Sequence, residues 1–116
     1  MYAEYFRGQG LSVVEVGSTD DAVPLIGSHD AVVTGLMVPG MDALDFIRQV
    51  RRERPRLPIV VVSACAFDDR LMKAQHAGAD VVLLKPCLPD RLLREVREAI
   101  ERMRHRSSAA DPDPAQ

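Results

Sequence analysis

The chain has 116 residues and a formal net charge of -2, with 47% hydrophobic and 28% charged residues. This length and composition fit one globular domain that buries a core without disulfides or a structural metal. The charge gives no general attraction to nucleic acid or to anionic lipid, and no apolar run reaches the roughly 18 residues of a membrane span. The first ten residues, MYAEYFRGQG, are too polar for a signal peptide, so we expect a cytoplasmic protein with reduced cysteines.

Stretches that favour strands alternate with stretches that favour helices. In chain order, the pattern predicts a strand at 11–16, a short helix at 18–26, a strand at 30–35, a helix at 42–54, a strand at 59–62, a helix at 67–77, a strand at 81–84 and a helix at 88–104. The run IVVV at 59–62 is apolar throughout, as expected for a parallel strand covered on both faces. The alternation therefore predicts an α/β fold with a parallel sheet and right-handed crossovers. The polar sequence SSAADPDPAQ predicts a disordered tail at 107–116, after a domain at 1–106.

Sites in such sheets form at the carboxyl ends of the strands. The second predicted strand ends at Gly35, the third ends at Ser63, and the fourth is followed by Lys85 and Pro86. We therefore expect a hydroxyl and an ammonium group to meet at one edge of the sheet, beside a residue that has no side chain.

Three segments carry a resemblance to a known family. DAVVTGLMVPGMDA from Asp30, IVVVSA from Ile59 and AGADVVLLKP from Ala77 resemble the receiver domain of two-component response regulators, over about residues 2–104. The resemblance implies a flavodoxin-like fold with five parallel strands in the order 2-1-3-4-5. It also implies an aspartate that takes a phosphoryl group from a histidine kinase, an acidic pair that holds Mg²⁺, a lysine and a hydroxyl that contact the phosphoryl group, and a switch aromatic on the last strand.

Several positions depart from that family pattern. Gly35 occupies the phosphoacceptor position and offers no nucleophile. The neighbouring Thr34 points to the opposite face of the strand and does not replace it. Ser63, Lys85 and Pro86 match the remaining phosphoryl-site positions, whereas Val82 stands in place of the switch aromatic. Asp42 matches an acid of the following loop, where we expect it to cap a helix.

The N-terminal part of the chain departs further from the family pattern. MYAEYFRGQG resembles the first helix of a receiver, which places the first strand and its acidic pair before Met1. A buried strand of about five apolar residues contributes around 10 kcal/mol, against a total domain stability of about 5–15 kcal/mol. We therefore expect either that the natural protein begins upstream or that rearrangement or a partner strand fills the gap, and we favour the first. Without the acidic pair, no Mg²⁺ site is expected.

These observations favour a stand-alone receiver-like domain that is not phosphorylated, is not an enzyme and works through protein–protein interaction. By resemblance, a histidine kinase or another signalling protein would dock on residues 67–104, with no nucleic-acid or membrane partner. The alternative is a small flavodoxin-like enzyme or ligand-binding protein that uses the vacated space near Ser63 and Lys85. A product with no retained role is a third possibility.

Other candidate sites in the sequence are weaker. Cys65 and Cys87 follow neighbouring strand ends and could approach one another, although buried single thiols are more common than a redox or metal pair. The three histidines are scattered, and we expect them to face solvent. The glycine spacing of residues 35–40 imitates a phosphate-binding loop, but the lysine and hydroxyl that such a loop needs are absent. Glutamates interleave the arginines of the last helix, which favours a solvated face.

Overall fold

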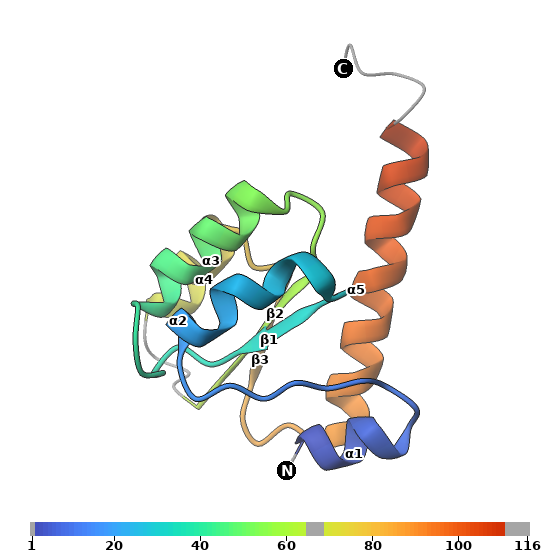
Figure 1. The fold of residues 1–116 in the computed structure, drawn as a ribbon, viewed down its shortest axis with the longest axis horizontal. Helices are drawn as coiled ribbons and strands as arrows, with labels where there is room; N and C mark the ends of the chain where they lie inside the picture. Colours follow the sequence, from blue (N-terminus) through green and yellow to red (C-terminus); the bar gives the residue numbers. More distant parts are fainter. Residues whose placement is uncertain (1, 65–68, 111–116) are drawn as a thin grey trace.

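The protein is described here as a computed structural model, which covers the backbone of residues 2–64 and 69–110 and their side chains up to residue 105. Within these residues, helices flank a parallel sheet of three strands in the order β1-β2-β3 (Figure 1). The strands are β1 (Val32–Thr34), β2 (Ile59–Ser63) and β3 (Val81–Leu84). The helices are α1 (Tyr2–Gly8), α2 (Thr19–Ala22), the 3-10 helix η1 (Val23–Ser28), α3 (Ala43–Glu53), α4 (Arg70–Ala77) and α5 (Pro89–Ala110). The α/β class and the parallel sheet are confirmed.

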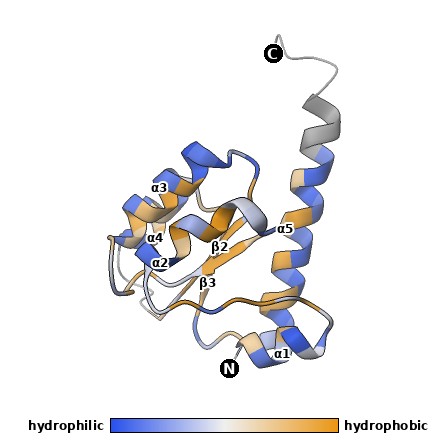
Figure 2. Ribbon diagram, viewed as in Figure 1, coloured by the Kyte–Doolittle hydropathy of each residue, from blue (hydrophilic) through white to orange (hydrophobic). Residues whose placement is uncertain are grey.

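Strand β2 lies at the centre of the sheet, and all of its residues are buried. Its alternate side chains supply two hydrophobic clusters. Ile59 and Val61 belong to a cluster with residues of η1, α3 and α4, whereas Val60 and Val62 belong to a cluster with residues of α1, β3 and α5. Figure 2 shows the strands as strongly apolar and α5 as a helix with apolar and polar faces. Each fully buried aliphatic side chain of β2 contributes about 1.5–3 kcal/mol.

The strand predicted at 11–16 is wrong. These residues have no regular secondary structure, and the exposed fractions of Val14 and Val16 are 56% and 42%. Leu11 and Val13 are half-buried against the cluster of α1 and α5. A valine-rich stretch forms a strand only when a neighbouring strand supplies hydrogen bonds, and no described strand lies beside this segment.

The helix ends follow the capping residues of the sequence. Asp42 caps α3, accepting a hydrogen bond from the Leu44 N–H at 2.8 Å. Gly78, with a φ of 130°, ends α4 as predicted. The last helix continues to Ala110, past the expected end at Arg104. The disordered tail predicted at 107–116 is therefore wrong for residues 107–110, which belong to this helix, and it stays a prediction for residues 111–116, which lie outside the described residues. Part of the helix predicted at 67–77 also lies outside the described residues.

An ion pair joins α3 to the turn that precedes β3. Arg51 Nη2 lies 2.7 Å from Asp80 Oδ2, and the same guanidinium donates to the Gly78 carbonyl oxygen. Asp80 Oδ2 also accepts from the Ile59 N–H at 2.8 Å, while the Asp80 N–H donates to the Ile59 carbonyl oxygen. The Arg51 and Asp80 side chains are 22% and 18% exposed. The pair therefore fixes α3, the end of α4 and the beginning of β2 at one point.

Replacing Asp80 with alanine should lower the free energy of unfolding by about 2–4 kcal/mol, because it leaves the Arg51 guanidinium and the Ile59 N–H without this partner. Urea denaturation measures the change. Asp45→Ala is the matched control, since Asp45 pairs with Arg48 on the exposed surface of α3. This control should cost less than about 1 kcal/mol. Equal losses in the two variants would contradict a special role for the Asp80 pair.

Candidate functional site

The carboxyl ends of the three parallel strands lie at one edge of the sheet (Figure 1). The three predicted site positions are found at these ends, because Gly35 follows β1, Ser63 is the last residue of β2, and Lys85 follows β3. The Lys85 N–H donates to the Ser63 carbonyl oxygen at 2.8 Å. A Cβ atom on Gly35 would lie 3.6 Å from the Val62 carbonyl oxygen. Ser63 is buried and Lys85 is exposed, so this edge presents an ammonium group to solvent.

Gly35 is not required by the backbone. Its φ lies outside the left-handed region, and a Cβ would meet only Val38 Cγ1 and the Val62 carbonyl oxygen, both at the ordinary contact distance of 3.6 Å. Gly40, in the same loop, differs in both respects. Its φ is 93°, and a Cβ there would lie 2.8 Å from Asp20 Oδ2. The absence of a side chain at residue 35 is therefore a chemical feature of the site and is not a consequence of the fold.

Thr19 holds the loop that follows Gly35. Its hydroxyl donates to the Met41 carbonyl oxygen at 2.8 Å, and its N–H donates to the Pro39 carbonyl oxygen at 3.1 Å. The residue is only 4% exposed, and it sits at the start of α2, where Ser18 accepts a capping hydrogen bond from the Asp21 N–H. The sequence pattern predicted a short helix at 18–26 but gave no sign of the contact between Thr19 and a loop about twenty residues further along the chain.

Arg70 also reaches this loop, from the beginning of α4. Its Nη2 lies 3.5 Å from Asp42 Oδ2 and donates to the Leu36 carbonyl oxygen at 3.4 Å. Its Nη1 donates to Met37 Sδ at 3.4 Å. The guanidinium thus brings a positive charge to the loop directly after Gly35. Nothing in the sequence near Arg70 indicated this, because its partners are 28 to 34 residues away.

Among the described residues, those at this edge do not fit a Mg²⁺ site, which requires oxygen ligands in an octahedral array. Gly35 offers no side-chain oxygen. Asp42 already accepts from the Leu44 N–H and faces Arg70. Across residues 2–64 and 69–110, no group of three or more His, Cys, Asp or Glu side chains could hold a metal ion.

The remaining predicted positions are occupied as follows. Val82, at the switch position, is half-buried against the cluster of α3 and α4. Pro86 is exposed and follows a cis peptide bond. The Thr34 hydroxyl donates to the Gly35 carbonyl oxygen at 3.0 Å. Cys87 is buried, while Cys65 lies outside the described residues, so the proximity of the two thiols stays a prediction.

One histidine differs from expectation. His29 is half-buried, and its Nδ1 lies 2.8 Å from the Leu25 carbonyl oxygen, so the prediction that it faces solvent is wrong. His76 and His105 are exposed, as predicted.

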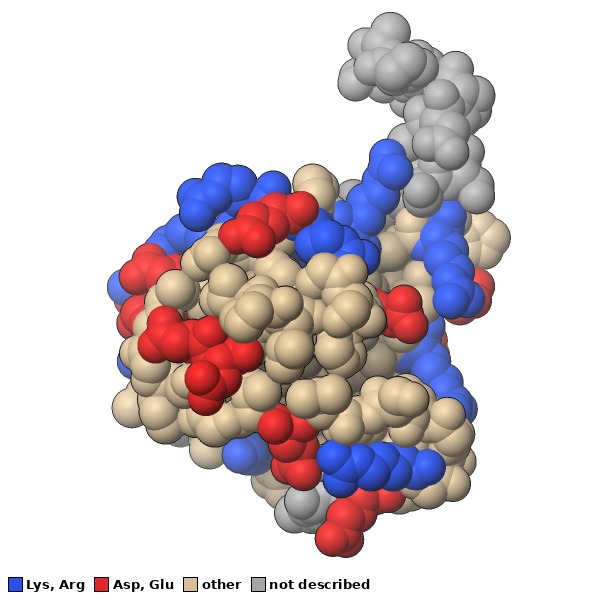
Figure 3. All heavy atoms as spheres, viewed as in Figure 1, with Lys and Arg blue, Asp and Glu red and all other residues tan. Residues whose placement is uncertain are grey.

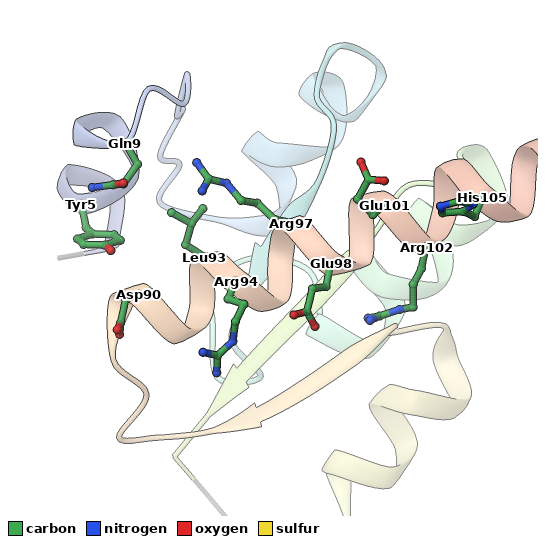
Figure 4. A pocket seen from close by; sticks show the side chains of 10 residues that line it. All are labelled: Tyr5, Gln9, Asp90, Leu93, Arg94, Arg97, Glu98, Glu101, Arg102 and His105. Atoms are coloured by element: carbon green, nitrogen blue, oxygen red, sulfur yellow. The ribbon is translucent and has the colours of Figure 1, made fainter.

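Two cavities among the described residues lie away from the strand ends, because Gly35, Ser63 and Lys85 line neither of them. The larger, about 600 Å³, lies between α1 and α5, with Tyr5 and Gln9 facing Leu93 and several charged side chains of α5 (Figure 4). The smaller, about 200 Å³, is lined by residues that include Asp30, Arg54 and Arg104. Figure 3 shows acidic and basic side chains distributed over the same face of the molecule. In the part of the chain that the structure describes, no helix could cross a membrane.

The parallel sheet, the helices on its two faces and the polar strand ends at one edge define a flavodoxin-like α/β domain. The family model of the response regulator receiver domain matches residues 1–97. The chain therefore belongs to the response regulator receiver family, as the sequence resemblance predicted.

Relatives and solved structures agree with this assignment. The chain is 30% identical over 100 residues to the chemotaxis protein CheY of Pseudomonas aeruginosa, an alignment that covers 80% of this chain and 81% of that protein. It is 32% identical over 104 residues to the regulatory protein LuxO of Vibrio cholerae, covering 88% of this chain but only 23% of LuxO. The chain thus spans about a quarter of the length of the LuxO proteins that it matches.

Two solved structures share the fold. A CheY-like receiver domain protein of Methanospirillum hungatei superposes with a TM-score of 0.82 at 18% identity, covering 90% of this chain and 85% of that one. NtrX of Brucella abortus in complex with ADP superposes with a TM-score of 0.85 at 22% identity, covering 95% of this chain and 26% of that one.

Gly35→Ala should raise the free energy of unfolding by about 0.4–1 kcal/mol, because the added Cβ meets ordinary contacts and the unfolded chain loses freedom. Gly40→Ala, in the same loop, should lower the free energy of unfolding by about 1–2 kcal/mol, because alanine is strained at the positive φ of this position. Urea denaturation of both variants tests the comparison. A loss at Gly35 as large as that at Gly40 would show that the site requires glycine for structural reasons.

Proposed function

We propose that this receiver domain is a pseudo-receiver, which transmits a signal through protein binding without accepting a phosphoryl group. The observation that carries the proposal is Gly35 at the carboxyl end of β1, directly beside the end of β2 and followed by a well-held loop. A phosphoryl acceptor needs a nucleophilic side chain, and glycine has none. The Thr34 hydroxyl, which is engaged with the Gly35 carbonyl oxygen, is not a substitute.

The proposal includes the metal and the mode of control. The chain described here binds no Mg²⁺ at this edge, because Gly35 supplies no ligand and Asp42 is engaged by α3 and Arg70. Without a covalent switch, control comes from the availability of a binding partner or from the abundance of the protein. The proposed protein is a stand-alone, cytoplasmic domain. In this proposal the phosphoryl-site positions that remain, Ser63, Lys85 and Pro86, are remnants without a phosphoryl group to contact.

The proposed docking surface consists of α4, β3 and α5, within residues 67–104. Three large apolar side chains are exposed on it: Met72 is 62% exposed, Leu84 45% and Leu88 70%. Exposed apolar side chains amid charged ones are typical of surfaces that bind proteins. A histidine kinase or another signalling protein is therefore the proposed partner. No observation on the described residues favours the enzyme or ligand-binding alternative, and the two cavities described above lie away from Ser63 and Lys85.

Incubation with acetyl phosphate and Mg²⁺ should leave the protein without a phosphoryl group, because no carboxylate stands at residue 35. Intact-mass spectrometry and phosphate-affinity electrophoresis measure the modification. A receiver domain with an aspartate at the matched position, treated in parallel, shows that the assay detects an acyl phosphate. A stoichiometric, hydroxylamine-labile phosphoryl group on this chain would contradict the pseudo-receiver proposal.

Replacing Met72 and Leu88 together with glutamine should weaken binding to the partner kinase or signalling protein by about tenfold or more, because exposed apolar anchors dominate such interfaces. Calorimetric titration against purified histidine kinases of the same organism measures the affinity. Val14→Gln removes an exposed apolar side chain from another part of the surface and serves as the control. If the control weakens binding as much as the double variant does, the partner docks elsewhere.

A further inference from the structure

A small cavity lies at the amino ends of the strands, away from the edge that carries Gly35. Its volume is about 200 Å³, and it lies between α5 and the segments that lead into β1 and β2 (Figure 1). Its charged lining residues are Asp30, Arg54, Arg56 and Arg104. Because the strands are parallel, this end of the sheet is opposite the one formed by the carboxyl ends, so the cavity is separate from the space near Ser63 and Lys85.

The charged groups that line this cavity are mainly basic. Three guanidinium groups and one carboxylate leave a balance of two positive charges. Arg104 also lies 3.4 Å from Glu101 Oε1, but both of these side chains are exposed, and exposed ion pairs contribute little. The Arg104 guanidinium can therefore turn to a ligand that carries more negative charge. The lining as a whole favours an anion.

Arg54 differs from the other half-buried arginines of the described chain. These are Arg51, Arg54 and Arg70. A carboxylate lies 2.7 Å from Arg51 and another lies 3.5 Å from Arg70, whereas no ion pair joins Arg54 to a described carboxylate. Its Nη1 donates to the Ile26 carbonyl oxygen. Since a guanidinium carries five N–H donors, Arg54 brings to the cavity a half-buried charge that the described residues do not pair.

Apolar side chains form the rest of the lining. Leu57, Pro58 and Met103 are buried, and Ile100 is half-buried. Interleaved charges commonly form a solvated surface, whereas these arginines come from two segments far apart in the sequence and share one cavity with apolar side chains. Pockets for drug-sized ligands have volumes of about 300–1,000 Å³. This cavity is smaller, so it accommodates one anionic group with a short organic part.

We propose that this cavity binds a small organic phosphate monoester. Such a group carries about −1.5 to −2 charges at pH 7 and three acceptor oxygens, which matches the two positive charges of the lining. The phosphate accepts hydrogen bonds from the guanidinium groups of Arg54 and Arg104, and the organic part packs against Ile100. A carboxylate brings a single charge and matches the lining less well. The site does not depend on whether the domain is phosphorylated or binds a kinase.

Amide-resolved NMR titration of the full 116-residue chain tests the site, with phenyl phosphate, inorganic phosphate and benzoate as probes. Phenyl phosphate should shift the amide signals of residues 30–32, 54–59 and 100–105. It should bind at least about fivefold more tightly than either other probe, because it alone combines a dianion with an apolar part. Equal affinities for phenyl phosphate and benzoate would overturn the proposal, as would shifts centred on Lys85.

Three variants that each change an exposed side chain locate the binding energy. Arg104→Gln should weaken phenyl phosphate binding by about fivefold or more, because it removes a charged hydrogen-bond donor from the cavity. Asp30→Asn should strengthen binding by about twofold to threefold, because it removes the negative charge from the lining. Arg52→Gln is the matched control, since this exposed arginine of α3 lines neither cavity, and it should leave the affinity unchanged.

The control separates a site from general attraction to a basic surface, because Arg52→Gln and Arg104→Gln change the net charge equally. Equal losses of affinity in these two variants would show general attraction and overturn the proposal. Weaker binding by Asp30→Asn would overturn it as well. Thermal unfolding of each variant, followed by circular dichroism, shows that the fold is retained, so a loss of affinity is read at the cavity itself.

Discussion

The burial of β2 on both faces is the constraint on which the rest of the structure depends. Residues 59 and 61 belong to one cluster and residues 60 and 62 to the other, so the helices on the two sides of the sheet pack against the same four consecutive residues. Parallel pairing with β1 and β3 then aligns the carboxyl ends of three strands. Gly35, Ser63 and Lys85 meet at one edge for this reason, although 28 and 22 residues separate them in the chain. The ion pair of Arg51 and Asp80 fixes the opposite end of β2 through the Ile59 N–H.

The sequence predicts those parts of the fold that depend on local pattern. Residues 59–62 were recognisable because a strand buried on both faces is apolar at every position, and the strand-end rule then located the site. Residues 11–16 are also rich in valine but pair with no described strand, and local sequence does not reveal whether a strand has a partner. Thr19 and Arg70 were missed for a related reason. Each holds the loop after Gly35 through partners at least twenty residues away. The residues next to Thr19 and Arg70 in the sequence indicate only the start of a helix.

At Gly35, the requirements of the fold can be distinguished from those of phosphoryl transfer. The position accepts a Cβ without strain, so the architecture does not distinguish a receiver with an acidic side chain from one without. The loop that follows is held by Thr19 and Arg70, neither of which requires a carboxylate at residue 35. Membership of the receiver family, which rests on the match over residues 1–97, therefore carries the fold to this chain, whereas phosphoryl transfer depends on the side chain at the phosphoacceptor position. At Gly35, where the resemblance places that residue, the fold makes no demand for glycine.

The fold constrains the polar groups at the carboxyl edge of the sheet to different degrees. Thr19 and Arg70 hold the loop after Gly35 through hydrogen bonds to backbone carbonyl oxygens, so the course of that loop does not depend on the side chain at residue 35. Ser63 is buried at the end of β2, and its carbonyl oxygen accepts from the Lys85 N–H, whereas the Lys85 side chain is exposed. A substitution at residue 35 would therefore change the chemistry of this edge while leaving in place the contacts that hold its loop.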